Sequence, residues 1–236
     1  MQRYFVNTKD DIFDLSSDDS YHITKVMRNQ IGDKIEVVIN KELYTCEIIN
    51  LDKSVKVKKL EKLDQDSELP CYVTIAQSLV KEQKMDLILQ KSCELGVSEI
   101  IPINTTRSVV KLDKKETKKI ERWNKILKEA SEQSKRLVIP KVNGILDIKD
   151  LTSLDYDIKI LCTVNELSTN IKKVLSKELN GVKIILVIGP EGGFTAKEEE
   201  LLINSGYIST SFGSRVLRTE TASLYALSII NYILMR

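Results

Sequence analysis

Two glycine-rich loops near the C-terminus hold the residues best suited to ligand chemistry. The first is Gly189-Pro190-Glu191-Gly192-Gly193, and the second covers residues 213–218, directly before Thr219 and Glu220. Adjacent glycines can adopt positive φ angles and leave room for a ligand to touch the backbone. No lysine follows the glycines and their spacing is not G-x-G-x-x-G, so neither the P-loop nor the dinucleotide-binding motif is present. The alternative interpretation of the first loop is an ordinary tight turn.

Each loop is predicted to join a strand to a helix. Residues 184–188 form a continuous apolar run rich in β-branched side chains, which is typical of a strand buried on both faces of a parallel sheet. Thr195 and Glu198 match a capping box, so a helix should begin there. Residues 207–212 predict a second strand, and residues 222–235 predict the last helix. Because ligands bind at the carboxyl ends of strands in open α/β sheets, both loops are expected at one ligand-binding edge.

Composition limits the class of protein. The 236 residues are 42% hydrophobic and 30% charged, which is typical of a globular protein with one large or two modest domains. No apolar stretch approaches membrane length and the N-terminus lacks a signal-peptide profile, so we expect a cytoplasmic protein without a membrane partner. His22 is the only histidine, and the 4 cysteines are isolated from one another. Neither a metal site nor a disulfide framework is therefore predicted.

The natural boundary between domains is the polar stretch at residues 64–68, which leads to Pro70. Before this linker, short alternating strands separated by turns predict a small β-barrel, with a hairpin turn at residues 40–42. A short helix is predicted over residues 20–30. The first domain is therefore expected to be rich in β-structure.

Beyond the linker, strands alternate with helices. The predicted strands include residues 71–79, 99–103 and 158–162. The helix between the first two should end at Gly96, which is well placed as the residue after the helix. This alternation predicts a mostly parallel sheet in an α/β domain.

A basic helix face lies in the middle of the chain. Residues 71–140 carry 14 Lys and Arg against 9 Asp and Glu, although the net charge of the whole protein is only +2. A nucleic-acid-binding protein needs a local basic face rather than a high overall charge. The alternative is a solvated helix face with Trp123 packed in the core on its opposite side. The basic side chains are Lys111, Lys114, Lys115, Lys118, Lys119, Arg122, Lys125 and Lys128.

The two loop motifs are part of a resemblance that covers nearly the whole chain. G-P-E-G-G-F-T at residues 189–195 and F-G-S-R-V-L-R-T-E-T-A at residues 212–222 resemble the ribosomal RNA small-subunit methyltransferase E family, within the SPOUT superfamily of trefoil-knotted methyltransferases. The N-terminal M-Q-R-Y-F-V, H-I-T-K-V-M-R at residues 22–28 and K-M-D-L-I-L-Q-K at residues 84–91 are similar to the same family. Ser214 departs from the family pattern, which usually has proline there, so the conformation of this loop is less well predicted.

The resemblance implies two domains. Residues 70–236 would form the α/β trefoil-knot domain with a mostly parallel sheet, with the knot and cofactor site within about 158–236, and residues 1–69 would form a PUA-like β-barrel that binds RNA. The implied partners are 16S ribosomal RNA in the small ribosomal subunit and a second copy of the chain, joined as a homodimer through the knotted domain.

The implied cofactor is S-adenosyl-L-methionine, with S-adenosyl-L-homocysteine as the product. The resemblance implies RNA contacts by Arg3, His22, Arg28 and Arg107. The residues implied in cofactor binding are Cys162, Thr163, Ile188, Gly189, Gly192, Gly193, Phe212, Gly213, Val216, Leu217 and Arg218.

The implied reaction is methylation of uridine N3 in the decoding region of 16S ribosomal RNA. The N3–H group is a weakly acidic imide, so its proton must leave and the resulting anion must be stabilised. Arg218 is the predicted stabiliser, because a guanidinium can donate to a uracil carbonyl oxygen. Glu220 or Glu191 would accept the proton, although a carboxylate such as Glu220 in the first turn of a helix is also favourable through the helix dipole alone. Action on a tRNA or another ribosomal RNA position, and a non-catalytic role in ribosome assembly, remain alternatives.

Overall fold

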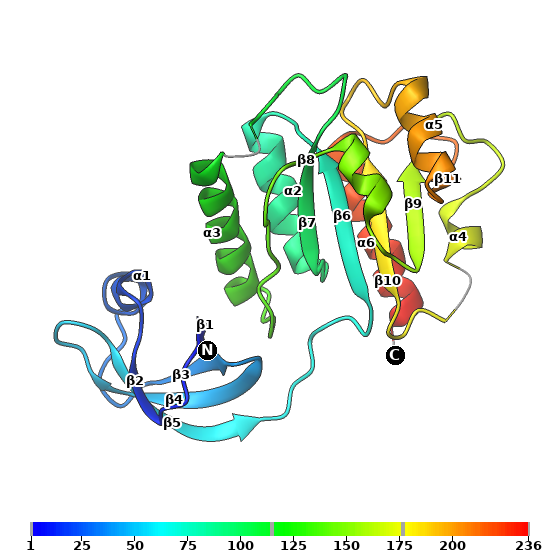
Figure 1. Ribbon diagram of the computed structural model, residues 1–236. Coiled ribbons are helices and arrows are strands. Elements are labelled where there is room, and N and C mark those ends of the chain that lie inside the picture. Colours follow the sequence, from blue (N-terminus) through cyan, green and yellow to red (C-terminus); the bar gives the residue numbers. More distant parts are fainter. Residues whose placement is uncertain (1, 114–115, 176–177, 236) are drawn as a thin grey trace. The chain divides into compact units, whose positions relative to one another are not determined.

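The computed structural model describes residues 2–113, 116–175 and 178–235, and the chain separates into two compact units (Figure 1). The first unit consists of Met1–Glu68 and Ser131–Val138, and the second consists of Leu69–Ala130 and Ile139–Arg236. Each unit has a sheet of its own.

The first unit is built on a five-stranded sheet around one hydrophobic core. β1 is parallel to β3, and the other neighbouring strands are antiparallel. In spatial order the strands are β1 (Arg3–Val6), β3 (Lys34–Ile39), β4 (Glu42–Asn50), β5 (Lys56–Leu63) and β2 (Ile12–Asp14). The predicted hairpin turn is confirmed, because Asn40 and Lys41 join β3 to β4 with φ angles of 51° and 72°. Two consecutive residues with positive φ are typical of a two-residue hairpin turn.

The helical segment of the first unit differs from its prediction. It begins at α1 (Ser17–Tyr21) because the Ser16 side chain accepts a hydrogen bond from the Asp19 N–H and so caps the helix. A π-helical segment, η1 (His22–Met27), follows directly and stops at Arg28, whose φ angle is 57°. The helix thus starts and ends earlier than the predicted residues 20–30.

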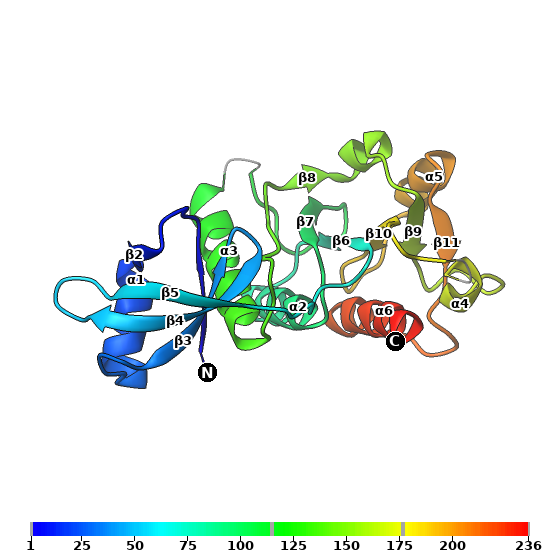
Figure 2. The same cartoon turned by 90° about the horizontal axis from the view of Figure 1, so that it is seen from below.

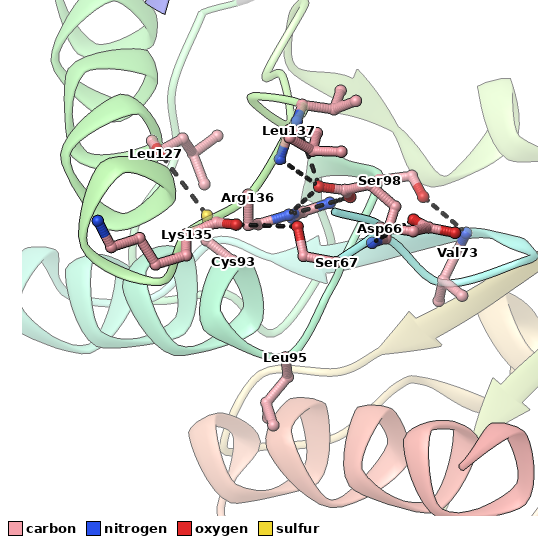
Figure 3. Close-up of polar contacts among 12 residues, drawn as sticks. Asp66, Ser67, Val73, Cys93, Leu95, Ser98, Leu127, Lys135, Arg136 and Leu137 are labelled. Atoms are coloured by element: carbon pink, nitrogen blue, oxygen red, sulfur yellow. Dashed lines mark hydrogen bonds and ion pairs between the residues drawn. The ribbon is translucent and has the colours of Figure 1, made fainter. Parts of the chain in front are cut away.

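Hydrogen bonds tie residues 131–138 to the linker (Figure 3). The Ser67 hydroxyl donates to the Lys135 carbonyl oxygen at 2.8 Å, and the Leu137 N–H donates to a Glu68 carboxylate oxygen at 2.8 Å. Glu68 also accepts from the buried Arg136 guanidinium. These hydrogen bonds explain why a segment more than 60 positions later in the sequence belongs to the first unit.

The second unit is built on a six-stranded sheet in which each strand is parallel to its neighbours. The fold class predicted for this part of the chain is therefore confirmed. β10 is buried between β9 and β6, as its apolar sequence predicted. In spatial order the strands are β11 (Ile208–Thr210), β9 (Ile158–Cys162), β10 (Lys183–Ile188), β6 (Tyr72–Ser78), β7 (Glu99–Asn104) and β8 (Leu146–Asp147).

Helices cover both faces of this sheet (Figure 2). One face shares a core with α2 (Glu82–Glu94), α3 (Thr117–Gln133), α4 (Ile171–Val174) and α6 (Thr219–Leu234). The other face packs against α5 (Ala196–Asn204) and the 3₁₀ helix η2 (Ile148–Ser153). This three-layer arrangement leaves the edge at the carboxyl ends of β9, β10 and β11 to the connecting loops.

Several local predictions for the second unit are confirmed. Trp123 is 3% exposed and packs in the core. Gly96 follows α2 with a φ angle of 86°, which favours glycine at this helix end. Thr195 and Glu198 form the predicted capping box at the start of α5. The last helix begins at Thr219, three residues before the predicted start at residue 222. In the described part of the chain, no helix has the length and apolarity that crossing a membrane requires.

Candidate functional site

A cavity of about 450 Å³ opens at the carboxyl edge of the second unit's sheet. Three loops form it, and each loop follows one of the parallel strands β9, β10 and β11. The structure brings together at this cavity every residue predicted to bind the cofactor. These residues are Cys162, Thr163, Ile188, Gly189, Gly192, Gly193, Phe212, Gly213, Val216, Leu217 and Arg218.

The loop after β10 is a closed turn built on its glycines. The Gly193 N–H donates to the Pro190 carbonyl oxygen at 2.9 Å, and the φ angle of Gly193 is 66°. A side chain at this position would be strained, because L-residues rarely adopt that conformation. At Gly189, a Cβ atom would lie 3.1 Å from the Phe194 ring. The glycines therefore keep the loop backbone against the cavity without side chains in between.

Arg107 holds this loop from the turn that follows β7. Its guanidinium donates to the Gly192 and Phe194 carbonyl oxygens at 2.9 and 3.0 Å. The preceding Thr106 N–H donates to Glu198 at 2.7 Å, and Glu198 also caps α5. Arg107 was predicted to contact RNA; in the structure its side chain lines the cavity and braces the glycine loop. Sequence reasoning missed this brace, because nothing in the local pattern pairs residue 107 with residues 192 and 194.

A buried polar network joins the ends of β6 and β10 to the start of α6. Gln77 is fully buried; its side-chain amide donates to the Thr219 hydroxyl at 2.9 Å and accepts from the Ser223 hydroxyl at 2.7 Å. The Thr219 hydroxyl in turn donates to the Gly189 carbonyl oxygen at 2.7 Å. The network fixes the first turn of α6, and therefore the main chain next to Arg218, relative to the glycine loop.

One wall of the cavity carries a carboxylate that the sequence pattern did not single out. Glu199 accepts hydrogen bonds from the Thr163 hydroxyl at 2.6 Å and from the Asn165 side-chain amide at 3.1 Å. All three residues line the cavity. This carboxylate is suited to a hydroxyl-bearing or cationic group of a bound ligand.

The predicted catalytic residues differ in their relation to the cavity. Arg218 lines the cavity, and its side chain makes no hydrogen bond or ion pair with any residue that the structure describes. Lys84, at the start of α2, donates to Glu191 at 2.6 Å and lies 3.7 Å from Glu220. The hydrogen bond from Lys84 is the main reason why the pKa of the Glu191 carboxyl is lowered. Glu220 does not line the cavity directly, and its Oε2 accepts no hydrogen bond from the described residues.

The three predicted RNA contacts in the first unit have different environments. Arg3 is 1% exposed, and its guanidinium donates to Glu36, to Gln65 and to the carbonyl oxygens of Lys135 and Arg136. Its burial does not favour a direct contact with RNA. His22 is half-buried, with a 3.0 Å hydrogen bond between its Nδ1 and the Tyr4 hydroxyl. Arg28 is exposed at the end of η1.

The predicted basic face is partly neutralised by neighbouring groups. Arg122 donates to Asp86 at 2.8 Å and lies 3.2 Å from Glu82, and Lys111 donates to the Thr105 carbonyl oxygen. Lys118 is exposed. Lys114 and Lys115 lie outside the described residues.

Comparisons with known proteins agree with this architecture. The family model described as an RNA methyltransferase domain matches residues 67–231, and the model described as an RNA methyltransferase PUA domain matches residues 15–60. Ribosomal RNA small subunit methyltransferase E from Bacillus subtilis is 39% identical over 98% of this chain and 96% of its own length. The enzyme of the same name from Buchnera aphidicola of Acyrthosiphon pisum is 32% identical over 92% of this chain and 86% of its own length.

Two solved structures are similar over almost their whole length. Ribosomal RNA small subunit methyltransferase E from Neisseria gonorrhoeae, bound to S-adenosyl methionine, has a TM-score of 0.90 at 28% identity and covers 99% of this chain and 98% of that one. A Legionella pneumophila protein in complex with the bound cofactor SAM has a TM-score of 0.90 at 30% identity and covers 98% of this chain and 97% of that one.

Proposed function

The chain belongs to the ribosomal RNA small subunit methyltransferase E family, and on this premise we propose that it methylates N3 of a uridine in the decoding region of 16S ribosomal RNA, with S-adenosyl-L-methionine as the methyl donor. The observation that carries the proposal is the cavity at the sheet edge, where glycine loops meet Arg218, whose guanidinium has no partner among the described residues. An assembly factor without catalysis would not need such a guanidinium beside a cofactor-sized cavity.

The cavity fits the proposed cofactor. Its volume of about 450 Å³ lies within the usual range for small-molecule sites. Gly193 leaves the loop backbone open, with no atom within 4 Å of the position that a Cβ would occupy. Ile188 and Leu217 offer apolar contacts, and Glu199 offers acceptors for ribose hydroxyls. When bound, the cofactor would supply an electrophilic methyl group.

Arg218 is the proposed stabiliser of the transition state. As the N3 proton leaves, negative charge develops on the carbonyl oxygens of uracil, and a guanidinium can donate to such an oxygen. Its donors are not occupied by any described residue, unlike those of Arg107. Arg218 also immediately precedes α6, whose first turn is fixed by the Gln77 network.

Glu220 is the proposed proton acceptor. Glu191 is less suited because Lys84 hydrogen-bonds to it and lowers the pKa of its carboxyl, which makes it a weaker base. Among the described residues no hydrogen bond reaches the Glu220 carboxylate, whose buried Oε2 lies 3.7 Å from the Lys84 ammonium. The proton would reach Glu220 directly or through a water molecule.

Each unit carries proposed RNA contacts of its own. Arg28 and His22 are the proposed contacts in the first unit, and Lys118 and the other exposed lysines of the basic face are the proposed contacts in the second. Arg3 and Arg107 are left out of this set, because their guanidiniums are bound within the protein.

We also propose a homodimer formed through the second unit, with the C-terminal segment knotted as in the SPOUT superfamily. Exposed apolar side chains along α6, including Tyr225, Tyr232 and Ile233, support a second packing partner. The ribosomal RNA substrate makes the cytoplasm the expected compartment.

Nucleoside mass spectrometry tests the proposed function. 16S ribosomal RNA from a strain that lacks the gene should have lost 3-methyluridine, and the wild-type gene should restore it. Recovery of the modified nucleoside in tRNA alone would transfer the activity to a tRNA substrate. An unchanged nucleoside profile would reject the methyltransferase function.

A further inference from the structure

Lys84 lies between two carboxylates, of which Glu191 lines the cavity. Its ammonium lies 2.6 Å from Glu191 in the glycine loop and 3.7 Å from Glu220 in the first turn of α6. The three residues come from separate parts of the chain. Lys84 and Glu191 are 107 positions apart in the sequence. The ammonium is thus the only group in this cluster that touches both carboxylates among the described residues.

The two carboxylates would repel each other without this cation. One oxygen of each lies within 4 Å of the same ammonium nitrogen, so these two oxygens are at most about 6.3 Å apart, the sum of the two distances. Like charges at such distances disfavour the ionised form of both groups. The interaction is reciprocal, because the hydrogen bond to Glu191 raises the pKa of Lys84 and keeps it charged.

We propose that Lys84 is a positioning residue for the methyl-transfer reaction, which binds Glu191 and offsets its negative charge beside Glu220, so that Glu220 can accept the uridine N3 proton. The inference rests on the proposed function. In the balanced step, the N3–H bond breaks and its proton passes to the Glu220 carboxylate, while the nitrogen electron pair forms the bond to the methyl carbon. The carbon–sulfur bond breaks, and its electron pair stays on sulfur in the neutral S-adenosyl-L-homocysteine product.

The other charged groups around the cluster are Lys81 and Arg218. Lys81, next to the start of α2, further lowers the pKa of the Glu191 carboxyl. The positive charge of Arg218 acts to lower the pKa of Lys84. Among the described residues, neither Arg218 nor Lys81 forms an ion pair with either carboxylate. Removing Lys84 would therefore leave the two carboxylates without the positive charge that lies between them.

The pH dependence of single-turnover methyl transfer tests this role. The full-length protein, saturated with S-adenosyl-L-methionine, is mixed with small ribosomal subunits that lack 3-methyluridine. In Lys84→Met, the rate below neutral pH should fall at least about tenfold and the acidic limb of the profile should move up by about one pH unit, because the proton acceptor must be ionised. At alkaline pH the rate should approach that of the wild type. Lys84→Arg keeps the charge and should retain a profile close to the wild type.

Two further variants separate repulsion from a general structural defect. Adding Glu191→Gln to Lys84→Met removes the second carboxylate and should move the acidic limb back toward lower pH. The control Lys91→Met breaks a similar lysine–carboxylate pair on the same helix, with Glu94 at 2.8 Å, and should leave the profile unchanged. Binding of S-adenosyl-L-homocysteine, measured by calorimetry, should be the same in Lys84→Met, Lys84→Arg and Lys91→Met as in the wild type, because neither lysine lines the cavity.

The possible results separate the role of Lys84 from the function on which it rests. A wild-type protein that forms no 3-methyluridine rejects the proposed function. An active wild type with an equally active Lys84→Met variant at every pH overturns the role of Lys84 alone. A rate loss in Lys84→Met that is the same at every pH, or that Glu191→Gln does not relieve, also overturns it, because a merely structural defect has that signature.

Discussion

At the residue scale, the two arginines of the cavity have opposite roles. Arg107 uses its guanidinium to hold the Gly192 and Phe194 carbonyl oxygens, whereas Arg218 presents a guanidinium with no partner among the described residues. A cation that the protein itself does not use is available to a substrate. The two residues should therefore respond differently to substitution.

Arg218→Ala should lower the single-turnover rate on the order of a hundredfold to a thousandfold, because it removes a donor to charge that develops only in the transition state. Arg218→Lys keeps the charge but loses the planar fork, so it should be impaired less. Quench-flow at saturating cofactor gives the rate, and calorimetry should give nearly unchanged affinity for S-adenosyl-L-homocysteine. A large drop in cofactor affinity with a normal rate would make Arg218 a pocket residue instead.

Gly193→Val should abolish binding of S-adenosyl-L-homocysteine while the protein stays folded. The φ angle of 66° strains any β-branched residue, and the loop backbone would have to move away from the cavity. Isothermal calorimetry measures the binding, and circular dichroism checks the fold. Gly181→Val is a matched control, because Gly181 also has a positive φ angle of 74° but does not line the cavity. Unchanged affinity in Gly193→Val would remove this loop from the cofactor site.

At the element scale, one buried carboxylate connects two segments of the cavity wall. Glu198 caps α5 by accepting from the Thr195 N–H at 2.8 Å, and it also accepts from the Thr106 N–H at 2.7 Å. Burial alone would raise the pKa of Glu198, but hydrogen bonds from Thr195 and Thr106 outweigh it, so the pKa is lowered. The glycine loop is thus held at its α5 end by an ionised side chain.

Glu198→Gln keeps an acceptor for the Thr195 and Thr106 N–H groups but removes the negative charge, so it should destabilise the protein by about 1 kcal/mol at neutral pH, because hydrogen bonds to a charged acceptor are stronger than those to a neutral one. A carboxyl group whose pKa is lowered by folding contributes stability above its unfolded pKa, and this contribution disappears as the pH falls through its folded pKa. The difference between wild type and variant should therefore shrink at acidic pH. Urea unfolding at neutral pH and at about pH 3, above and below the ordinary pKa of a glutamate carboxyl, measures it. A difference that stays constant would mean that the charge of Glu198 is not what matters.

At the scale of the whole molecule, each unit carries its own proposed RNA contacts. Arg28 and His22 belong to the first unit, and the exposed lysines of the basic face belong to the second. The internal ion pairs of Arg122 with Asp86 and Glu82 reduce the net charge of that face. Its contribution to binding is therefore expected to come from the remaining lysines.

Neutralising Lys118 and Lys119 together should weaken RNA binding and flatten the dependence of log K on log salt. The slope should fall by about 0.7–0.9 for each phosphate that the variant no longer neutralises. Filter binding of a 16S ribosomal RNA fragment at several salt concentrations measures the slope. Neutralising Arg122 should have less effect, because its charge is already paired with Asp86. A slope that does not change in the double variant would make the basic face an ordinary solvated surface.

The sequence by itself determined the features whose causes are local. The buried strand before Gly189, the capping box of Thr195 and Glu198, and the turn at Asn40 each follow from the properties of a few neighbouring residues. The membership of the family, predicted from motifs, is confirmed by relatives that match along nearly the whole chain. Parallel strands that each end in a loop also predicted one ligand-binding edge, and the cavity lies there.

Only the tertiary structure decided which distant side chains meet. The brace from Arg107 to the glycine loop, the contact of Lys84 with Glu191 and Glu220, and the membership of residues 131–138 in the first unit all join segments far apart in the sequence. No local period or cap encodes such pairs, because they depend on how helices and strands pack against one another. For the same reason, the sequence alone did not decide whether Glu191 or Glu220 is the better proton acceptor. The neighbours of the two carboxylates are set by the packing of α2 against α6 and by the position of the glycine loop.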